Sequence, residues 1–228
     1  MTAFQQAPRY FFVALIALAT SVFAQQEISD AEKHVFMEDH LKNVVGATTL
    51  NYQFTKAGAL EKGFEDQVSV SIKPTGAGKN CHVDFLTGEH QFRQLQDVIE
   101  NATGNPVILA FLERDVSEMK RITKGQPNYY RKRIRMALAQ NAEVKPVTIK
   151  FSGKELPGRE IILTPYEDDP ARPRYEKFSN KSYTITLSEE IPGGVYKLRS
   201  VMQGRANKDA STGKPMIEET LTFTGSKK

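Results

Sequence analysis

The sequence predicts an α+β protein in which a curved, half-barrel-like antiparallel β-sheet is covered by an N-terminal helix and a central helical hairpin. Two observations lead to this prediction. Segments with alternating apolar and polar residues stand on both sides of the middle of the chain, and such alternation is typical of strands with one buried face. Between them, residues 105–140 carry apolar residues at helical spacing, interrupted once by glycine and proline.

The first 24 residues have the layout of a secretory signal peptide. Arg9 is the only charged residue among them, and the apolar run that follows ends in Val22 and Ala24, whose small side chains suit a signal-peptidase site. We therefore expect cleavage near Ala24 and a protein that is periplasmic or secreted. The apolar run is short for a membrane anchor, which needs roughly 20 apolar residues. No later segment has the length and apolarity of a membrane span.

Length and composition limit the remaining possibilities. The chain has 228 residues and a formal net charge of +4, which is too small to predict nucleic acid as a partner. After the signal peptide, residues 25–228 could form one domain. Alternatively, an α+β domain at residues 25–141 could precede a β-sandwich at residues 146–228. Cys81 is the only cysteine, so no internal disulfide can form.

A helix is expected at residues 30–45. Ser29 and Glu32 have the spacing of a capping box at its start, and Gly46 follows its end. The apolar residues that recur at helical spacing are Met37, Leu41, Val44 and Val45.

Three alternating runs follow and predict an antiparallel meander with one buried face. The residues expected on that face are Leu50, Tyr52, Phe54, Val68, Val70, Ile72, Cys81, Val83 and Phe85. The pattern makes Cys81 a buried thiol that packs as a small apolar residue. A reactive thiol or a metal ligand is the alternative.

The helical hairpin is expected to begin at Asn105, a good N-cap, with Pro106 at the first helical position. Gly125 is expected to end the first helix in the left-handed conformation. The first helix would bury Ile108, Leu112, Val116, Met119 and Ile122, and the second Tyr130, Ile134, Ala137 and Leu138. Five further strand-like runs follow, with exposed loops expected at residues 167–174 and 204–214.

The second helix of the hairpin contains four cations among residues 131–135. On a helical wheel, Arg131 and Arg135 border the apolar face, whereas Lys132 lies almost opposite it. We consider Arg131, Arg135 and Lys132 candidate contacts for an anionic partner, either a lipid headgroup or an acidic protein. The alternative is a solvated face whose side-chain stems cover the sheet.

The sequence lacks the common catalytic and cofactor-binding motifs. The sequence has no G-x-S-x-G, H-E-x-x-H, P-loop or G-x-G-x-x-G, so we expect a protein that is not an enzyme and holds no cofactor. The acidic pairs Asp168–Asp169 and Glu189–Glu190 lie in turn-like segments and are expected to be solvated.

A metal site has weak support in the sequence. His34, Met37 and His40 are spaced by three residues and could bind copper in an oxidising compartment. However, Met37 also belongs to the apolar stripe, and there is no Cys–His cluster with zinc spacing. We predict no metal, although the sequence leaves metal binding by these residues or by Cys81 open.

The order of signal peptide, capped helix, strand meander, central helices and further strands resembles that of periplasmic lipoprotein-carrier proteins of the LolA-like family. The likeness rests on the helix at residues 30–45, on "TTLNYQF" and on the stripe from Ile108 to Met119. It implies an unclosed sheet around an apolar cavity, with helices as a lid. The segment "ITLSEEIPGGVYKLRS" instead resembles strands of immunoglobulin-like or transthyretin-like sandwiches, which keeps the two-domain alternative open.

These observations predict a non-catalytic binding protein that holds an apolar ligand, a lipid or a lipidated protein between sheet and helices. The alternative is a periplasmic interaction or assembly protein whose surface includes residues 128–140. A large apolar cavity under the hairpin would favour the first function, and a filled interior would favour the second.

Overall fold

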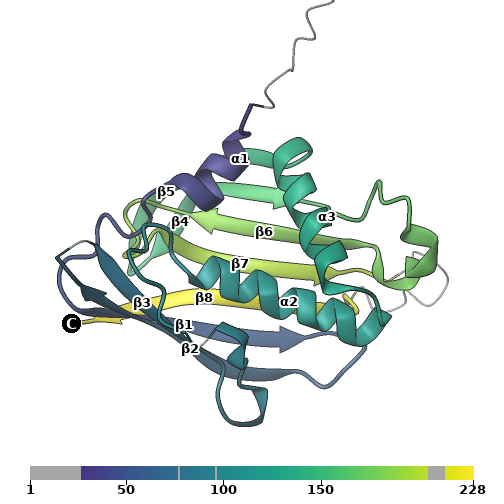
Figure 1. The fold of residues 1–228 in the computed structure, drawn as a ribbon, viewed down its shortest axis with the longest axis horizontal. Helices are drawn as coiled ribbons and strands as arrows, with labels where there is room; N and C mark the ends of the chain where they lie inside the picture. The colour runs from purple at the N-terminus through teal and green to yellow at the C-terminus, as the bar shows by residue number, and fades with distance from the viewer. Residues whose placement is uncertain (1–26, 77, 96, 205–213) are drawn as a thin grey trace, which may run out of the picture.

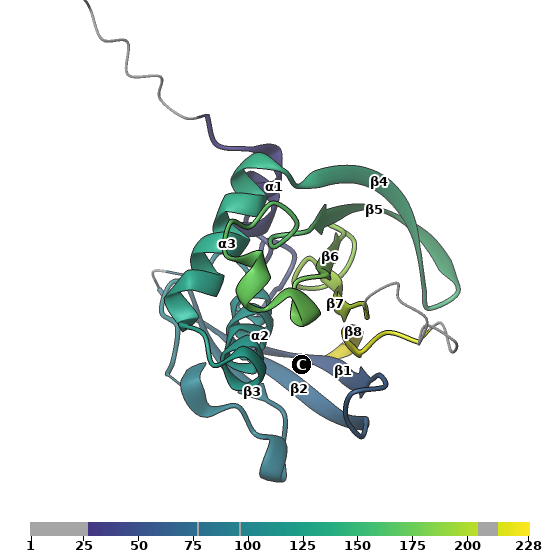
Figure 2. The same ribbon diagram turned by 90° about the vertical axis from the view of Figure 1, so that its right-hand side faces the viewer.

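The computed structural model describes residues 27–204 and 214–228, except for residues 77 and 96. The predicted signal peptide and nearly all of the predicted loop at residues 204–214 lie outside the described residues. Eight strands form one open sheet in the order β3-β2-β1-β8-β7-β6-β5-β4. Helices α2 and α3 cover one face of this sheet, and Figures 1 and 2 show its curvature. The predicted α+β class and the curved, unclosed sheet are confirmed.

All neighbouring strands pair in the antiparallel direction. The strands are β1 (Thr48–Ala57), β2 (Phe64–Pro74), β3 (Lys79–Phe85), β4 (Glu143–Phe151), β5 (Lys154–Leu163), β6 (Lys181–Leu187), β7 (Val195–Met202) and β8 (Ile217–Lys227). The meander β1–β2–β3 buries the nine residues predicted for its inner face. Strand β8 pairs with β1 on one side and with β7 on the other, so the strands before and after the hairpin belong to one sheet.

The helices are α1 (Asp30–Glu32), which continues as a π-helix (Lys33–Met37), α2 (Val107–Thr123) and α3 (Pro127–Gln140). Short 3₁₀ helices are found at Gly88–His90, Arg93–Leu95, Arg172–Arg174 and Glu176–Phe178.

The N-terminal helix is shorter than predicted. The capping box between Ser29 and Glu32 is present, but the helix ends at Met37 instead of continuing to Val45. Met37 and Val45 are 59% and 77% exposed, although the periodicity placed both on the buried face. Leu41 is buried as predicted, in a turn instead of a helix.

His40 provides the physical reason for this early end. Its buried ring lies with Nε2 2.7 Å from the carbonyl oxygen of His34, and Nδ1 accepts the backbone N–H of Asn105 at 3.2 Å. Burial lowers the pKa of His40, which favours the neutral ring that these two contacts require. These contacts draw the chain away from the helix axis, and tertiary contacts commonly override helical propensity in this way.

The hairpin matches its predicted form apart from its turn and Ile122, which is partly buried and not fully buried as predicted. The side chain of Asn105 accepts the N–H of Val107 at 3.1 Å, and α2 begins there. At the other end, Lys124 and not Gly125 adopts the left-handed conformation, with φ of 59°. Gly125 serves a different purpose, because any Cβ at this position would overlap the hydroxyl group of Tyr130.

Candidate functional site

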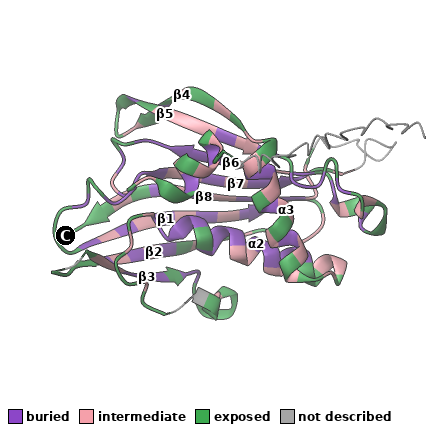
Figure 3. Cartoon of the chain, turned by 45° about the horizontal axis from the view of Figure 1, so that its top comes forward, coloured by how far each residue is buried: buried purple, intermediate pink, exposed green. Residues whose placement is uncertain are grey.

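The interface between α2 and the sheet is the first candidate site, because the predicted ligand cavity would lie there. Ile108, Leu112, Val116 and Met119 of α2 are buried against the sheet as predicted. Figure 3 shows exposed residues on the outward side of both helices. The described part of the chain has clefts of about 430–520 Å³ that other elements line, without contribution from residues 107–123. Beneath α2, its apolar side chains and those of the sheet belong to one buried cluster.

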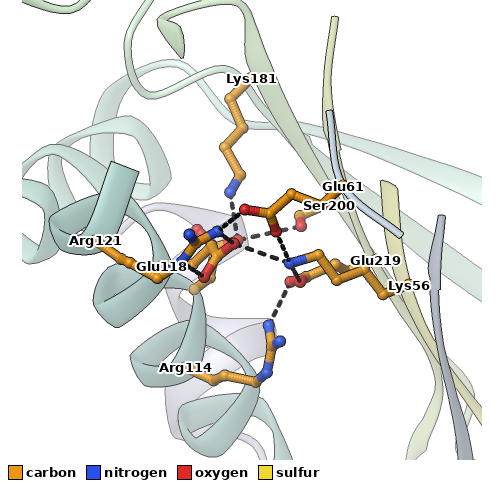
Figure 4. Close-up of polar contacts among 9 residues, drawn as sticks. Lys56, Glu61, Arg114, Glu118, Arg121, Lys181, Ser200 and Glu219 are labelled. Carbon is orange, nitrogen blue, oxygen red and sulfur yellow. Dashed lines mark hydrogen bonds and ion pairs between the residues drawn. The ribbon is translucent and has the colours of Figure 1, made fainter. Parts of the chain in front are cut away.

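Part of that space contains charged side chains (Figure 4). The ammonium group of Lys56 on β1 lies 2.8 Å from Glu61 and 2.9 Å from Glu118 of α2. Arg121 of α2 binds the same Glu118 at 2.7 Å and also binds Glu61. Lys56 and Glu118 are both largely buried, so each charged group contacts its partner in place of water.

Two further contacts join α2 to the central strands. Arg114 donates to Glu219 of β8 at 2.7 Å, and its guanidinium group stacks over the ring of Phe54. The other carboxylate oxygen of Glu219 is buried without a hydrogen bond, and Lys56 lies 3.8 Å from it. A buried carboxylate is costly without nearby opposite charge, and Arg114 and Lys56 supply that charge to Glu219.

Asp115 forms the deepest of these contacts. Its carboxylate binds the ammonium group of Lys181 on β6, and it accepts hydroxyl hydrogens from Tyr183 at 2.6 Å and Ser200 at 3.2 Å. The side chains of Asp115 and Lys181 are each only 1% exposed. We call the whole set of α2–sheet ion pairs the seam; it comprises Lys56, Glu61, Arg114, Asp115, Glu118, Arg121, Lys181 and Glu219.

The ion pairs of the seam shift the pKa values of several of its members, as Glu118 and Lys56 illustrate. Burial alone would raise the pKa of Glu118, but hydrogen bonds from Arg121 and Lys56 outweigh it and lower this pKa to about 2. Burial likewise disfavours the charged form of Lys56, yet hydrogen bonds to Glu61 and Glu118 leave its pKa raised. Both groups therefore stay charged across the physiological pH range.

The seam was not among the predicted sites, although the strand alternation contained a signal for it. Lys56 stands in phase with the inward residues of β1, and Glu219 stands in phase with Leu221 and Phe223 of β8. Lys181 is in phase with Tyr183 in the same way. A charged residue at an inward position predicts a buried partner of opposite charge, because an unpaired charge cannot remain there.

The three predicted anion contacts on α3 do not form one group. The guanidinium group of Arg131 binds both carboxylate oxygens of Glu113 on α2, at 2.7 and 2.6 Å. Lys132 and Arg135 are exposed and line a groove of about 430 Å³ beside the N-terminal segment. Thus Arg131 connects the two helices, whereas Lys132 and Arg135 remain available to a partner.

The predicted exposed loop at residues 167–174 is partly buried, which corrects the prediction for Asp169. This carboxylate is 5% exposed and accepts hydrogen bonds from the hydroxyl groups of Tyr129 and Tyr175 and from the N–H of Ala171. Burial opposes its ionisation, but these hydrogen bonds leave the pKa of Asp169 lowered. The loop folds back because this residue finds its partners on α3 and in the following 3₁₀ segment. Asp168, Glu189 and Glu190 are exposed as predicted.

The histidine and cysteine residues take part in ordinary packing contacts. His34 lies 2.6 Å from Glu38, which also binds Arg159. Cys81 is buried as predicted, and burial raises its pKa to about 11. In the described ranges, no group of three or more His, Cys, Asp or Glu side chains could hold a metal ion. No helix in the same ranges has the length and apolarity needed to cross a membrane.

No protein-family model matches the chain, and no curated protein matches it. Among solved structures, the chain is similar to lipoprotein LppX of Mycobacterium tuberculosis, with 8% sequence identity and a TM-score of 0.36. This match covers 86% of the present chain and 95% of the LppX chain. A LolA superfamily protein of Nitrosomonas europaea is 8% identical, with coverage of 86% and 92% and a TM-score of 0.25. A DUF1329 family protein of Desulfovibrio piger is 8% identical, with coverage of 86% and 91% and a TM-score of 0.28. A protein of the LolA superfamily, which the sequence layout resembles, is thus among these neighbours.

Proposed function

We propose that this is an exported, non-catalytic binding protein that takes up a lipid, or the lipid chain of a lipoprotein, between the sheet and the hairpin α2–α3. The observation that carries the proposal is how the hairpin is attached. In the described residues, no backbone hydrogen bond joins residues 107–140 to a strand. The hairpin can therefore lift as a layer without breaking a strand pairing.

The surface beneath the hairpin suits an acyl chain. Cross-strand register places Leu50, Phe54, Val70, Leu198 and Leu221 on one face, and all five are buried. Opening would expose this apolar face to a ligand, which would replace the side chains of α2. The structure is the closed form in this scheme, with the seam holding α2 in place.

The chain would act as one folding unit in this scheme. Since β8 lies between β1 and β7, we propose that residues 25–228 form a single domain. Urea unfolding followed by tyrosine fluorescence and by circular dichroism should give one coincident transition. Two separated transitions would support the alternative division near residues 141–146.

A second candidate function is favoured by the filled interior and by the exposed Lys132 and Arg135. In this alternative, the protein is an interaction or assembly protein that works through the outer surface of α3, and the hairpin never opens. The two functions differ in whether the protein can withdraw a lipid molecule from a membrane.

The test uses the exported, processed protein and vesicles that contain a phospholipid with one fluorescent acyl chain. Carrier function predicts that soluble protein removes about one labelled lipid per chain, and that the lipid changes tryptic cleavage after the exposed Lys124. Arg114→Ala, which breaks one seam contact, should speed the transfer. If no lipid is withdrawn and cleavage after Lys124 is unchanged, the carrier proposal is wrong and the surface function stands.

A further inference from the structure

The groove on the outer side of α3 has two walls of opposite charge. It lies where the N-terminal segment runs beside α3 (Figure 1). The hydroxyl group of Ser29 donates to the carbonyl oxygen of Leu138 at 2.8 Å, which fixes the segment against the helix. The groove is thus a built feature of the fold, and it is separate from the interface between α2 and the sheet.

The helix supplies the positive wall. Lys132 and Arg135 are exposed, and neither forms an ion pair within the part of the chain that the structure describes. Arg131, one position before Lys132, is by contrast held by Glu113. The two free cations lie almost one helical turn apart, so both can reach one bound anion from the same wall.

The N-terminal segment supplies the negative wall. Glu27 and Glu32 of this segment line the same groove as the two cations of α3. Glu32 accepts the N–H of Ser29 at 3.1 Å, which holds its carboxylate in place. Glu27 is exposed and has no ion pair among the described residues.

Apolar side chains lie between these walls. Ile28 is 48% exposed, and Met136 and Ala139 line the groove beside it. An isolated exposed apolar residue needs no explanation, but apolar residues in a groove with fixed charges on both sides are typical of ligand sites. The volume of about 430 Å³ falls in the usual range for a small-molecule pocket.

We propose that this groove binds the headgroup of a zwitterionic phospholipid of the phosphoethanolamine class at a membrane surface. The phosphate would lie against Lys132 and Arg135, and the ammonium group would lie against Glu27 and Glu32. The glycerol end would contact Ile28 and Met136. A purely anionic ligand fits less well, because two carboxylates would face it without a counter-charge.

The test measures sedimentation of the exported, processed protein with vesicles of phosphatidylethanolamine and phosphatidylcholine. Lys132→Gln combined with Arg135→Gln should weaken binding about tenfold or more, because it removes two charge-assisted hydrogen bonds to the phosphate group. The matched control is Lys62→Gln with Lys73→Gln, which removes the same charge from exposed positions near β2 and should leave binding unchanged. Glu27→Gln should weaken binding to these vesicles.

Other outcomes overturn the proposal. Absent binding by the unaltered protein, or equal binding by both double variants, would exclude this groove as the site. If vesicles with phosphatidylglycerol bind more tightly and Glu27→Gln strengthens that binding, the groove recognises simple anions and not a zwitterion. Lipid withdrawal into solution is measured separately from vesicle sedimentation. A negative sedimentation result would therefore exclude the headgroup site without contradicting the proposed carrier function. A negative withdrawal result would exclude the carrier function without contradicting the headgroup site.

Discussion

Helices α2 and α3 both carry charged side chains, but the buried charges of α2 face the sheet, whereas two of the four cations of α3 face water. On α2, Asp115 and Glu118 are buried against strands, whereas on α3, Lys132 and Arg135 are in water. The difference follows from the signs of the charges. The charged residues of α2 include both signs and meet opposite charges on the sheet, whereas the α3 run is entirely cationic. A run of one sign cannot neutralise itself, so it remains solvated unless another element supplies counter-charges.

The largest test of this contrast is Asp115→Ala on the buried side. The substitution leaves the ammonium group of Lys181 buried without its carboxylate, and the expected loss is about 3–5 kcal/mol of unfolding free energy. Urea denaturation followed by circular dichroism measures it. Asp115→Ala combined with Lys181→Met should recover a large part of the loss, because it removes the stranded charge. A loss below about 1 kcal/mol would mean that this pair does not hold α2.

The apolar part of the same interface is tested by Leu112→Ala. Leu112 is 7% exposed in the middle of the stripe, and truncating it should leave a cavity that costs about 2–5 kcal/mol. Leu109→Ala is the matched control, because Leu109 lies on the same helix but is 47% exposed. Similar losses for the two variants would contradict the described orientation of α2.

A third test uses pH. The pKa of Glu118 is lowered in the folded protein from 4.5 to about 2, so the unfolded chain binds the proton more tightly. Its stabilising contribution, up to about 3 kcal/mol, is therefore present above pH 4.5 and is lost as the pH falls towards 2. Glu118→Gln should remove this part of the acid dependence in urea titrations at several pH values. An unchanged acid profile would show that Glu118 does not contribute in this way.

The smallest effects are expected on α3. Arg131→Ala should cost about 0–1 kcal/mol, because its pair with Glu113 is partly solvated, and Arg135→Ala should cost less still. If an anionic partner binds this helix, Arg135→Ala should weaken the binding more than Arg131→Ala does. Added salt should reduce this loss of affinity, because it screens exposed charges. Thermal unfolding and a partner titration at two salt concentrations separate these effects. A larger stability loss for Arg135→Ala would break the contrast between the helices.

Local patterns predicted the sheet and the hairpin because one-sided burial leaves a clear periodicity. Alternation identified the inner residues of β1–β3, and four of the five stripe residues of α2 are buried, with Ile122 at its C-terminal end only partly buried. The sequence could not show how far the N-terminal helix extends, because its end depends on the contact between His40 and Asn105, which are 65 residues apart. Apolar recurrence alone therefore extended that helix to Val45.

The candidate sites were less predictable for a related reason. Arg131 and Arg135 look equivalent on a helical wheel, and only the position of Glu113 on the neighbouring helix distinguishes them. The seam joins residues that are distant in sequence, such as Asp115 and Lys181, and no spacing rule connects them. Lys56, Lys181 and Glu219 alternate in phase with the inward apolar residues of their strands, and this pattern indicates burial without identifying the partner.

The position of β8 has a consequence for export. Strand β1 lies beside β8, and the hydroxyl group of Thr224 donates to the carbonyl oxygen of Asn51 across a separation of 173 residues. The centre of the sheet therefore cannot assemble until residues 217–227 have been synthesised. Contacts of such long range slow folding. If the chain is exported, as its first 24 residues predict, we expect the nascent chain to remain threadable through a translocation channel and to complete its sheet only on the far side of the membrane.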